Sequence, residues 1–300
     1  LQMPNCRLQR AASIAIAVLV GIFFANITLP NLGSTNHAHE LHKLVTLRKH
    51  YQCRDKRNVG GRNKRNPEGV WAVCFDALNA RPAGQGCRVL SVGIANDFSF
   101  DDAMAALPYG CTVDSMDPSM GRPDHKHAKF VNFHNFGLAA NDMDGMRGVK
   151  MGTRTVQRWK VHSLRTVMQV LNAPSVDVLK VDVEGSELDV LESLVSSKSS
   201  ALAGVRQLLI EIHLWPDRSP PGNRDRAAFT NRWLRVFARL HDDLGFRTFS
   251  LHTNPMSSGT DWGAGHRPCC YEIGFFRPDG IADGSAEDGP DSINSLPEVI

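Results

Sequence analysis

The sequence predicts a doubly wound α/β domain, with a mostly parallel sheet, helices on both faces and an antiparallel strand at one edge. Between residues 87 and 276, short apolar runs of strand length alternate with stretches that have the apolar spacing of amphipathic helices. No helical stretch separates the last two apolar runs, so we expect the chain to reverse direction there. A longer apolar run near the N-terminus predicts a transmembrane helix before this domain.

The elements follow from these patterns in chain order. Pro67 precedes an apolar stretch up to residue 78, which we expect to be a helix opened by proline. The predicted strands are 88–92, 111–116, 129–133, 176–181, 205–212, 247–251 and 271–276. The predicted helices are 99–107, 163–171, 186–195 and 226–244. Residues 139–161, rich in Gly, Asn, Asp and Met, fit neither pattern and indicate an insertion.

The N-terminal run, residues 11–29, contains no charged residue and is long enough to cross a bilayer. Arg7 and Arg10 precede it, so the positive-inside rule predicts a type II signal anchor with the rest of the chain luminal. A cleaved signal peptide is the alternative. We expect a single-pass protein of the Golgi or endoplasmic reticulum, or a secreted one. The predicted regions are a lead and anchor (1–30), a basic stem (31–66), the α/β domain (67–277) and an acidic disordered tail (278–300).

Charge and cysteine content narrow the partners and the compartment. The net charge of +3 is small for 300 residues, so no nucleic-acid partner is expected. Six cysteines follow the apolar run, an even number that suits an oxidising compartment and up to three disulfides. Six cysteines allow 15 pairings, and the sequence does not choose among them. Buried free thiols are the alternative.

The first candidate site follows the strand at 88–92. Gly93 ends this strand, Asn96 and Asp97 follow in the loop, and a helix begins near Ser99. Ligands of doubly wound sheets bind at the carboxyl ends of the strands, and glycine permits close approach there. The G-x-G-x-x-G fingerprint of dinucleotide binding is absent, whereas carboxylates such as Asp97 are compatible with a cationic cofactor. An ordinary strand-to-helix turn capped by serine is the alternative.

Asp117 ends the next predicted strand, 24 residues after Gly93. An acid at this point accepts hydrogen bonds from the ribose hydroxyls of adenosine cofactors. A turn-forming aspartate before Pro118 is the alternative.

Two acids follow the strand at 176–181. Asp182 and Glu184 are two residues apart, which in an extended chain puts both on one face. Burying two carboxylates in an apolar core is costly, so a pocket is the more plausible setting. They are predicted to hold a cation or to take a proton from an attacking hydroxyl.

Glu211 and His213 end the strand at 205–212, and we expect them at the same rim as Asp182. Either is a candidate general base. Together with Asp182 they also form one imidazole and two carboxylates, the ligands of a divalent metal site. We do not expect a bound metal, and a divalent metal ion held by these three residues is the less favoured alternative.

These blocks resemble the methyltransferase-like protein 24 family and, more distantly, FkbM-type methyltransferases. The resemblance rests on VGIANDFSFDDAM, CTVDSMDPSM, DVLKVDVEGSE, LLIEIHLW and CCYEI, and covers roughly residues 71–276. It implies a Rossmann-like fold with S-adenosyl-L-methionine as methyl donor. By this likeness Gly93 and Asp117 match cofactor positions, and Asp182 lies beside the methyl-transfer centre.

The expected activity is methylation of a hydroxyl on a glycan or small molecule in the secretory pathway. Asp182, Glu211 and His213 are the candidate catalytic residues. The candidate cofactor-binding residues are Gly93, Asn96, Asp97, Asp117, Asp182 and Glu184. Two other classes remain: a non-catalytic luminal binding protein that keeps the fold, and an NAD-dependent oxidoreductase, which the missing glycine fingerprint disfavours.

Overall fold

The computed structural model describes residues 51–61, 69–79, 86–106, 108, 110–196, 201–214, 226–254, 260–261, 266–267 and 269–278. The predicted anchor, the predicted stem up to residue 50 and residues 279–300 of the predicted tail lie outside the described residues. Within the described ranges, none of the helices combines the length and the apolar character that crossing a bilayer requires.

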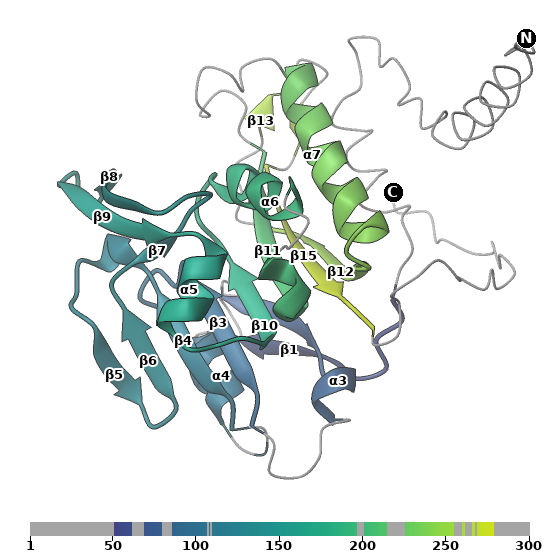
Figure 1. The fold of residues 1–300 in the computed structure, drawn as a ribbon, viewed down its shortest axis with the longest axis horizontal. Coiled ribbons are helices and arrows are strands. Elements are labelled where there is room, and N and C mark those ends of the chain that lie inside the picture. The colour runs from purple at the N-terminus through teal and green to yellow at the C-terminus, as the bar shows by residue number, and fades with distance from the viewer. Residues whose placement is uncertain are drawn as a thin grey trace, which may run out of the picture. The chain divides into compact units, whose positions relative to one another are not determined.

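An eight-stranded sheet forms the centre of the domain, in the order β12-β15-β11-β10-β3-β4-β6-β5 (Figure 1). Its strands are β3 (Arg88–Val92), β4 (Thr112–Met116), β5 (His125–Ala128), β6 (Val131–His134), β10 (Val176–Val181), β11 (Val205–His213), β12 (Arg247–Thr253) and β15 (Cys270–Phe276). The five strands from β11 to β6 are mutually parallel. All six residues of β10 are buried, as expected for a central strand covered on both faces.

The mostly parallel α/β sheet and the antiparallel pairing predicted at one edge are both confirmed, although the last strand of the chain is not itself the edge strand. β15 pairs antiparallel with both β11 and β12, so it lies one strand inside the edge. β15, the last of these strands in the chain, lies between β11 and β12, so β12 is the edge strand. At the other edge, β5 also pairs antiparallel, with β6.

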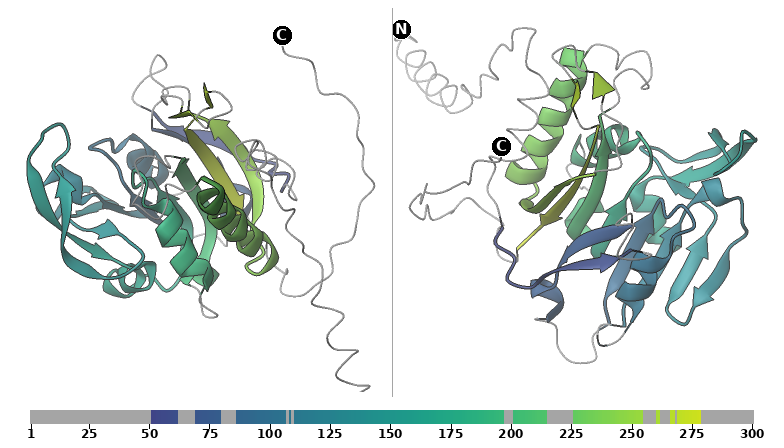
Figure 2. Two further views of the ribbon diagram at one scale, coloured as in Figure 1. Left: turned by 90° about the horizontal axis from the view of Figure 1, so that it is seen from above. Right: turned by 180° about the vertical axis from the view of Figure 1, so that it is seen from behind.

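Helices cover both faces of this sheet. α5 (Leu164–Val170), α6 (Glu187–Ser196) and α7 (Arg226–Asp242) lie on one face, and α4 (Ser99–Ala105) lies on the other (Figures 1 and 2). α7 buries one stripe of side chains: Phe229, Trp233, Val236, Phe237 and Leu240. This spacing of three or four residues is what an amphipathic helix requires. The described residues also include two short 3₁₀ helices, η1 (Pro118–Met120) and η2 (Ala201–Gly204).

A two-stranded sheet packs on the α4 face, and sequence reasoning did not foresee it. β1 (Lys56–Gly60) pairs antiparallel with β2 (Val70–Cys74), and a short helix, α3 (Asp76–Asn79), follows. The predicted helix up to residue 78 was therefore wrong over β2. Trp71 and Val73 are buried whereas Val70 and Ala72 are partly exposed, the alternation of a strand. β1 lies in the segment predicted as a stem, so residues 51–61 join the folded region.

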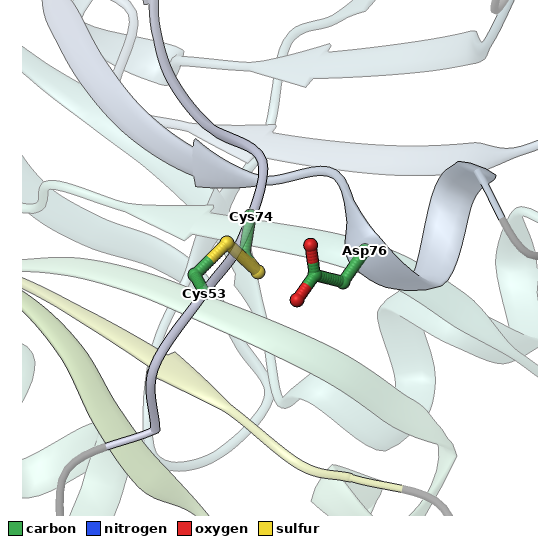
Figure 3. Close-up of side chains that lie close together, drawn as sticks. All are labelled: Cys53, Cys74 and Asp76. Carbon is green, nitrogen blue, oxygen red and sulfur yellow. A yellow bond between two sulfur atoms is a disulfide. The ribbon is translucent and has the colours of Figure 1, made fainter.

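Three disulfides form, at Cys53–Cys74, Cys87–Cys111 and Cys269–Cys270. The first ties the segment before β1 to the end of β2, with the carboxylate of Asp76 beside it (Figure 3). Asp76 accepts hydrogen bonds from the Tyr51 hydroxyl at 3.0 Å and the backbone N–H of Asp55 at 2.9 Å. Because both Cys53 and Cys74 are in the disulfide, this cluster offers no thiolate to a metal. The second bridge joins the residues that precede β3 and β4.

The predicted insertion forms a separate three-stranded sheet in the order β7-β9-β8. Its strands are β7 (Gly137–Leu138), β8 (Met143–Val149) and β9 (Val156–His162), and β8 and β9 project as a hairpin (Figure 1). Two short strands, β13 (Thr260–Asp261) and β14 (His266–Arg267), pair with each other.

Candidate functional site

A cavity of about 680 Å³ lies over the carboxyl ends of β3, β10 and β11, on the face that β1 and β2 cover. This volume is within the usual range for sites that bind drug-sized ligands, roughly 300–1,000 Å³. Of the predicted site residues, Gly93, Asp97, Asp182, Glu184 and Glu211 line the cavity. Asn96, Asp117 and His213 are not among the lining residues.

Gly93 follows β3, and its backbone lies close to the backbone of Asp182, which follows β10. Its φ is +74°, and a Cβ atom at this position would overlap the carbonyl oxygen of Asp182. The N–H of Asp182 donates to the carbonyl of Val92 at 3.1 Å, which holds the two strand ends together. Glycine is therefore required here both for the left-handed conformation and for the close approach.

Asp182 lines the cavity and, in the part of the chain that the structure describes, has one carboxylate oxygen without a hydrogen bond. Within the described residues, its Oδ1 atom is buried and has no hydrogen-bond partner. Burial raises the pKa of Asp182 to about 7, Lys180 opposes this shift, and the charges of Glu211 and Glu184 add to it. A buried carboxylate without a hydrogen bond is costly unless a cation accompanies it. Glu184, in the turn with φ of +54°, is much more exposed.

Neighbouring strands add charged side chains to the same cavity wall. Glu211 of β11 is buried and accepts a hydrogen bond from Nδ2 of Asn254 at 2.8 Å. Glu272 of β15 lies directly opposite Glu211 in the strand register. Lys180 of β10 donates from Nζ to the carbonyl of Gly93 at 3.0 Å and lies over the Trp71 ring. The wall thus gathers several carboxylates around one buried lysine.

Asp117 holds the Gly93 loop rather than facing the cavity. Its Oδ2 accepts the N–H of Ala95 at 2.8 Å, and its Oδ1 accepts the N–H of Ser119 at 2.9 Å. A carboxylate oxygen can accept more than one hydrogen bond, so Asp117 can still accept hydrogen bonds from ribose hydroxyls. Asn96 is exposed in the same loop, with φ of +59°. Asp117 therefore lies next to the Gly93 loop, and Gly93 lies next to Asp182, but Asp117 is not among the residues that line the cavity.

His213 lies behind the cavity, buried against the start of α6. Its Nδ1 is 3.0 Å from Oε1 of Glu187, and its Nε2 is 3.6 Å from Oε2 of Glu184. Burial disfavours the charged imidazolium, but the hydrogen bond and charge of Glu187, with Asp182 and Glu211, raise the pKa of His213 to about 9. His213 is therefore a cation near neutral pH.

The potential metal ligands that the structure brings together differ from the three residues predicted from the sequence. Ligand atoms of Asp182, Glu187 and His213 all lie within 4.8 Å of one another. Oε1 of Glu187 also accepts the N–H groups of Val183 at 3.0 Å and Gly185 at 3.2 Å. Since these contacts and His213 already occupy that oxygen, a metal ion would have to displace them. Glu211, His213 and Cys270 form a second set, whose Cys270 is in a disulfide.

Three titratable groups at the cavity, Asp182, His213 and Glu272, make stability depend on pH in the same direction. Burial, and then the charges of Glu211 and Asp182, raise the pKa of Glu272 from 4.5 to about 8. The folded chain therefore binds more protons than the unfolded chain between these values, and the same holds for Asp182 between 3.8 and about 7. His213, raised from 6.5 to about 9, acts in the same sense. The free energy of unfolding must then fall as pH rises through these windows.

We expect the melting temperature of the ligand-free chain to decrease steadily as pH rises from 4.5 to about 8. Glu272→Gln should flatten this profile and be the more stable protein at its alkaline end, because the variant loses the cost of ionising a crowded carboxyl. Scanning calorimetry at a series of pH values measures both. A profile that rises with pH, or one that Glu272→Gln leaves unchanged, contradicts this account of the cavity wall.

Sequence reasoning missed three features of the site. Glu272 lies inside the CCYEI motif, in the last predicted strand. Nothing in the sequence pattern indicated that this acid lies at the same edge of the sheet as Asp182. Lys180 looked like an ordinary member of a buried strand, although a lysine in an apolar run is itself unusual. The third feature, the wall made by Lys56, Asn58 and residues 69–72, comes from the hairpin that was not predicted.

Comparison with known proteins is consistent with this geometry. A family model described as a methyltransferase domain matches residues 19–259. The chain is 30% identical over 188 residues to probable methyltransferase-like protein 24 of Homo sapiens, which covers 60% of this chain and 47% of that protein. Identity to the Rattus norvegicus protein of the same name is 28% over 187 residues, 61% of this chain and 48% of that one.

A third similarity is to the AMB antimetabolite synthetase AmbE of Pseudomonas aeruginosa, 33% identical over 130 residues. It covers 43% of this chain but 5% of that protein. The chain thus spans about half the length of the curated methyltransferase-like relatives that it matches.

Proposed function

Because the chain belongs to this methyltransferase-domain family, we propose that it uses S-adenosyl-L-methionine to methylate a hydroxyl group on a glycan or small molecule. One observation carries the proposal: Asp182, which lines the cavity of about 680 Å³ beside the Gly93 turn, has a buried carboxylate oxygen without a hydrogen-bond partner among the described residues. A sulfonium cation is the kind of group that such a carboxylate accepts.

The residues present fit this cofactor. Gly93 leaves backbone without a side chain at the strand ends, and Asp117 holds the following loop by accepting the N–H of Ala95. We assign Gly93, Asn96, Asp97 and Asp117 to the adenosine half of the site, with Asp182 and Glu184 towards the methionine half. The acids that would repel a pyrophosphate suit a cofactor without phosphate, which favours this assignment over NAD.

The proposed mechanism gives the three candidate catalytic residues different tasks. When bound, the cofactor supplies a methyl group activated by positive sulfur. Asp182 holds the cationic end in place. Glu211, oriented by Asn254, would accept the proton that the acceptor hydroxyl loses as the methyl group passes from sulfur to the hydroxyl oxygen. His213 keeps its proton and fixes the turn that carries Glu184 through its contact with Glu187.

Orientation supplies most of the rate in this proposal, because a methyl group on positive sulfur needs little further activation. Residues of β1 and β2 form one wall of the cavity that the carboxylates line. The acceptor half of the cavity lies towards β12 and β15, where Ser250, His252 and Asn254 provide hydrogen-bonding groups.

We also propose that the chain works in the secretory pathway, attached by a type II anchor or released after cleavage. Three disulfides support an oxidising compartment. The apolar run at residues 11–29 supports membrane targeting. The acceptors expected there are glycans and small molecules.

The test combines binding with transfer. We expect calorimetry to detect S-adenosylhomocysteine binding, and a co-crystal to place its sulfur near Asp182 and Glu211. Tritium from methyl-labelled S-adenosylmethionine should enter a glycan fraction as an ether that resists mild alkali. Alkali-labile label would indicate an ester instead. Binding of NAD with no binding of S-adenosylhomocysteine would refute the proposal, and cofactor binding without transfer to any acceptor would favour a non-catalytic role.

A further inference from the structure

The disulfide between Cys269 and Cys270 differs from the other two in what it can stabilise. The other two bridges join residues 21 and 24 positions apart, whereas this one joins neighbours in the sequence. A disulfide stabilises a fold mainly by closing a loop in the unfolded chain, and the gain falls as the loop becomes shorter. A bridge between neighbours closes almost no loop. Its contribution to the stability of the fold is therefore small.

Neighbouring positions are also an unfavourable geometry for a disulfide. The Cα atoms of Cys269 and Cys270 are 3.7 Å apart, because a single peptide bond joins the two residues. Most disulfides span roughly 4.4–6.8 Å between Cα atoms, and departures from this range make the bond easier to reduce. Structural bridges of secreted proteins resist reduction, whereas strained bridges are the labile ones. Cys269–Cys270 is therefore the bridge that a dithiol of the secretory pathway would open first.

This bridge lies beside two side chains of types that bind metals. Cys270 is directly opposite His213 in the antiparallel pairing of β15 with β11, and Glu211 lies two residues before His213, on the same face of the strand. All three residues are buried, and one ligand atom from each lies within 4.8 Å of the other two. Thiolate, imidazole and carboxylate are the ligands that zinc prefers in proteins. The disulfide withholds the thiolate of this set.

Hydrogen bonds already orient the other two ligands. Nδ1 of His213 is 3.0 Å from Oε1 of Glu187, and such a contact with a carboxylate is typical of histidines that bind zinc through their other ring nitrogen. Nδ2 of Asn254 donates to Oε1 of Glu211 at 2.8 Å. The backbone N–H of Asn254 donates to the carbonyl of Cys270 at 3.1 Å, which ties this support to the bridge itself.

We propose that reduction of the Cys269–Cys270 disulfide by a dithiol creates a zinc site, in which Cys270, His213 and Glu211 bind Zn²⁺. The dithiol gives two electrons and two protons to the sulfur atoms of the bridge, the bond between them breaks, and the dithiol becomes a cyclic disulfide. Zn²⁺ then displaces one proton from the Cys270 thiol and one from the His213 imidazolium. Three protein ligands leave the fourth tetrahedral position of the zinc ion to water.

The first experiment asks whether this bridge opens alone. The full chain, purified with its three disulfides, is equilibrated at increasing ratios of reduced to oxidised dithiothreitol. Free thiols are trapped with N-ethylmaleimide, and peptide mass spectrometry follows each bridge separately. Cys269–Cys270 should be half reduced at a ratio about 100-fold lower than either of the other bridges requires. Opening of all three bridges at the same ratio would overturn the proposal.

The second experiment uses Co²⁺ as the probe for zinc, because coordination of a thiolate to Co²⁺ gives a charge-transfer absorption band. Protein reduced only at Cys269–Cys270, and then freed of dithiothreitol, should bind one Co²⁺ ion with this band and release it to Zn²⁺. The oxidised protein should lack the band and bind Co²⁺ at least about 100-fold more weakly. Equal affinity of both forms, or binding without the band, would show that Cys270 is not a ligand.

Two neighbouring substitutions form a matched pair. Cys269→Ser breaks the bridge but keeps the Cys270 thiol, so this variant should bind Co²⁺ with the charge-transfer band in the absence of any reductant. Cys270→Ser breaks the same bridge but removes the ligand, so it should show no band in either redox state. Melting curves should stay close to the wild type, because the lost bridge closes almost no loop. Equal cobalt spectra of the two variants would refute the site.

The wild-type measurements decide the question even where a variant does not fold. They involve no turnover, so they test the zinc site separately from the proposed methyl transfer. Because Glu211 is also the proposed base, zinc held by Glu211 should stop methyl transfer. A zinc-bound protein that still transfers methyl would count against Glu211 as the base and leave the zinc site in place.

Discussion

Asp182→Asn should bind S-adenosylmethionine about 10- to 100-fold more weakly than the wild type, while its affinity for S-adenosylhomocysteine changes much less. A contact between a charged group and its partner contributes about 1.5–3 kcal/mol. The homocysteine product has no sulfonium, so it does not depend on the negative charge of Asp182. Asparagine keeps the size of the side chain, and the Oδ1 position has no hydrogen bond within the described residues to lose. Calorimetric titration with both ligands measures the two affinities.

Glu184→Gln is the matched control for this experiment. Glu184 lines the same cavity from the same turn, but its side chain is 75% exposed. An exposed charge is screened by water, so its removal should change either affinity by no more than a few-fold. Should Glu184→Gln match Asp182→Asn, or should Asp182→Asn bind and transfer methyl normally, the site has been placed on the wrong carboxylate.

Gly93→Ala should abolish cofactor binding and destabilise the domain. A residue with a side chain held at φ of +74° costs about 1–3 kcal/mol, and the added Cβ would also overlap the carbonyl oxygen of Asp182. Relief requires β3 and β10 to move apart, which carries Asp182 out of position. Denaturant unfolding measures the loss of stability, and calorimetry with S-adenosylhomocysteine measures the loss of binding.

Gly86→Ala controls for the general effect of replacing glycine in this strand region. A Cβ at Gly86 meets nothing within 4 Å, and Gly86 precedes β3 at the opposite end from Gly93. This variant should bind the cofactor as the wild type does. Wild-type binding and stability in Gly93→Ala would show that the strand ends are not packed as described.

The sequence predicts the half of the site that belongs to parallel strands. A short run rich in valine and leucine such as 176–181 predicts a buried strand, and the acids that follow such a strand are expected at the carboxyl edge of the sheet. The positions of Gly93, Asp117 and Asp182 follow from this rule alone. The same rule placed Glu211 on the edge beside them.

The rest depends on pairings between distant parts of the chain. Glu272 faces Glu211 because β15 inserts antiparallel between β11 and β12, and no local pattern specifies that choice. β1 has only exposed residues at its first three positions, so its sequence resembles a polar linker. The direction of His213 was also not predictable, because its partner Glu187 comes from the following helix rather than from the strand ends.

The bridge between Cys53 and Cys74 has a practical consequence for anyone who prepares this protein. It fixes the strand pair that contributes Lys56, Asn58 and Trp71 to the cavity wall. Recombinant material made in a reducing cytoplasm, or assayed in dithiothreitol, would have that wall untethered. A lack of turnover in such a preparation carries no weight until mass spectrometry has shown that the two sulfur atoms are joined.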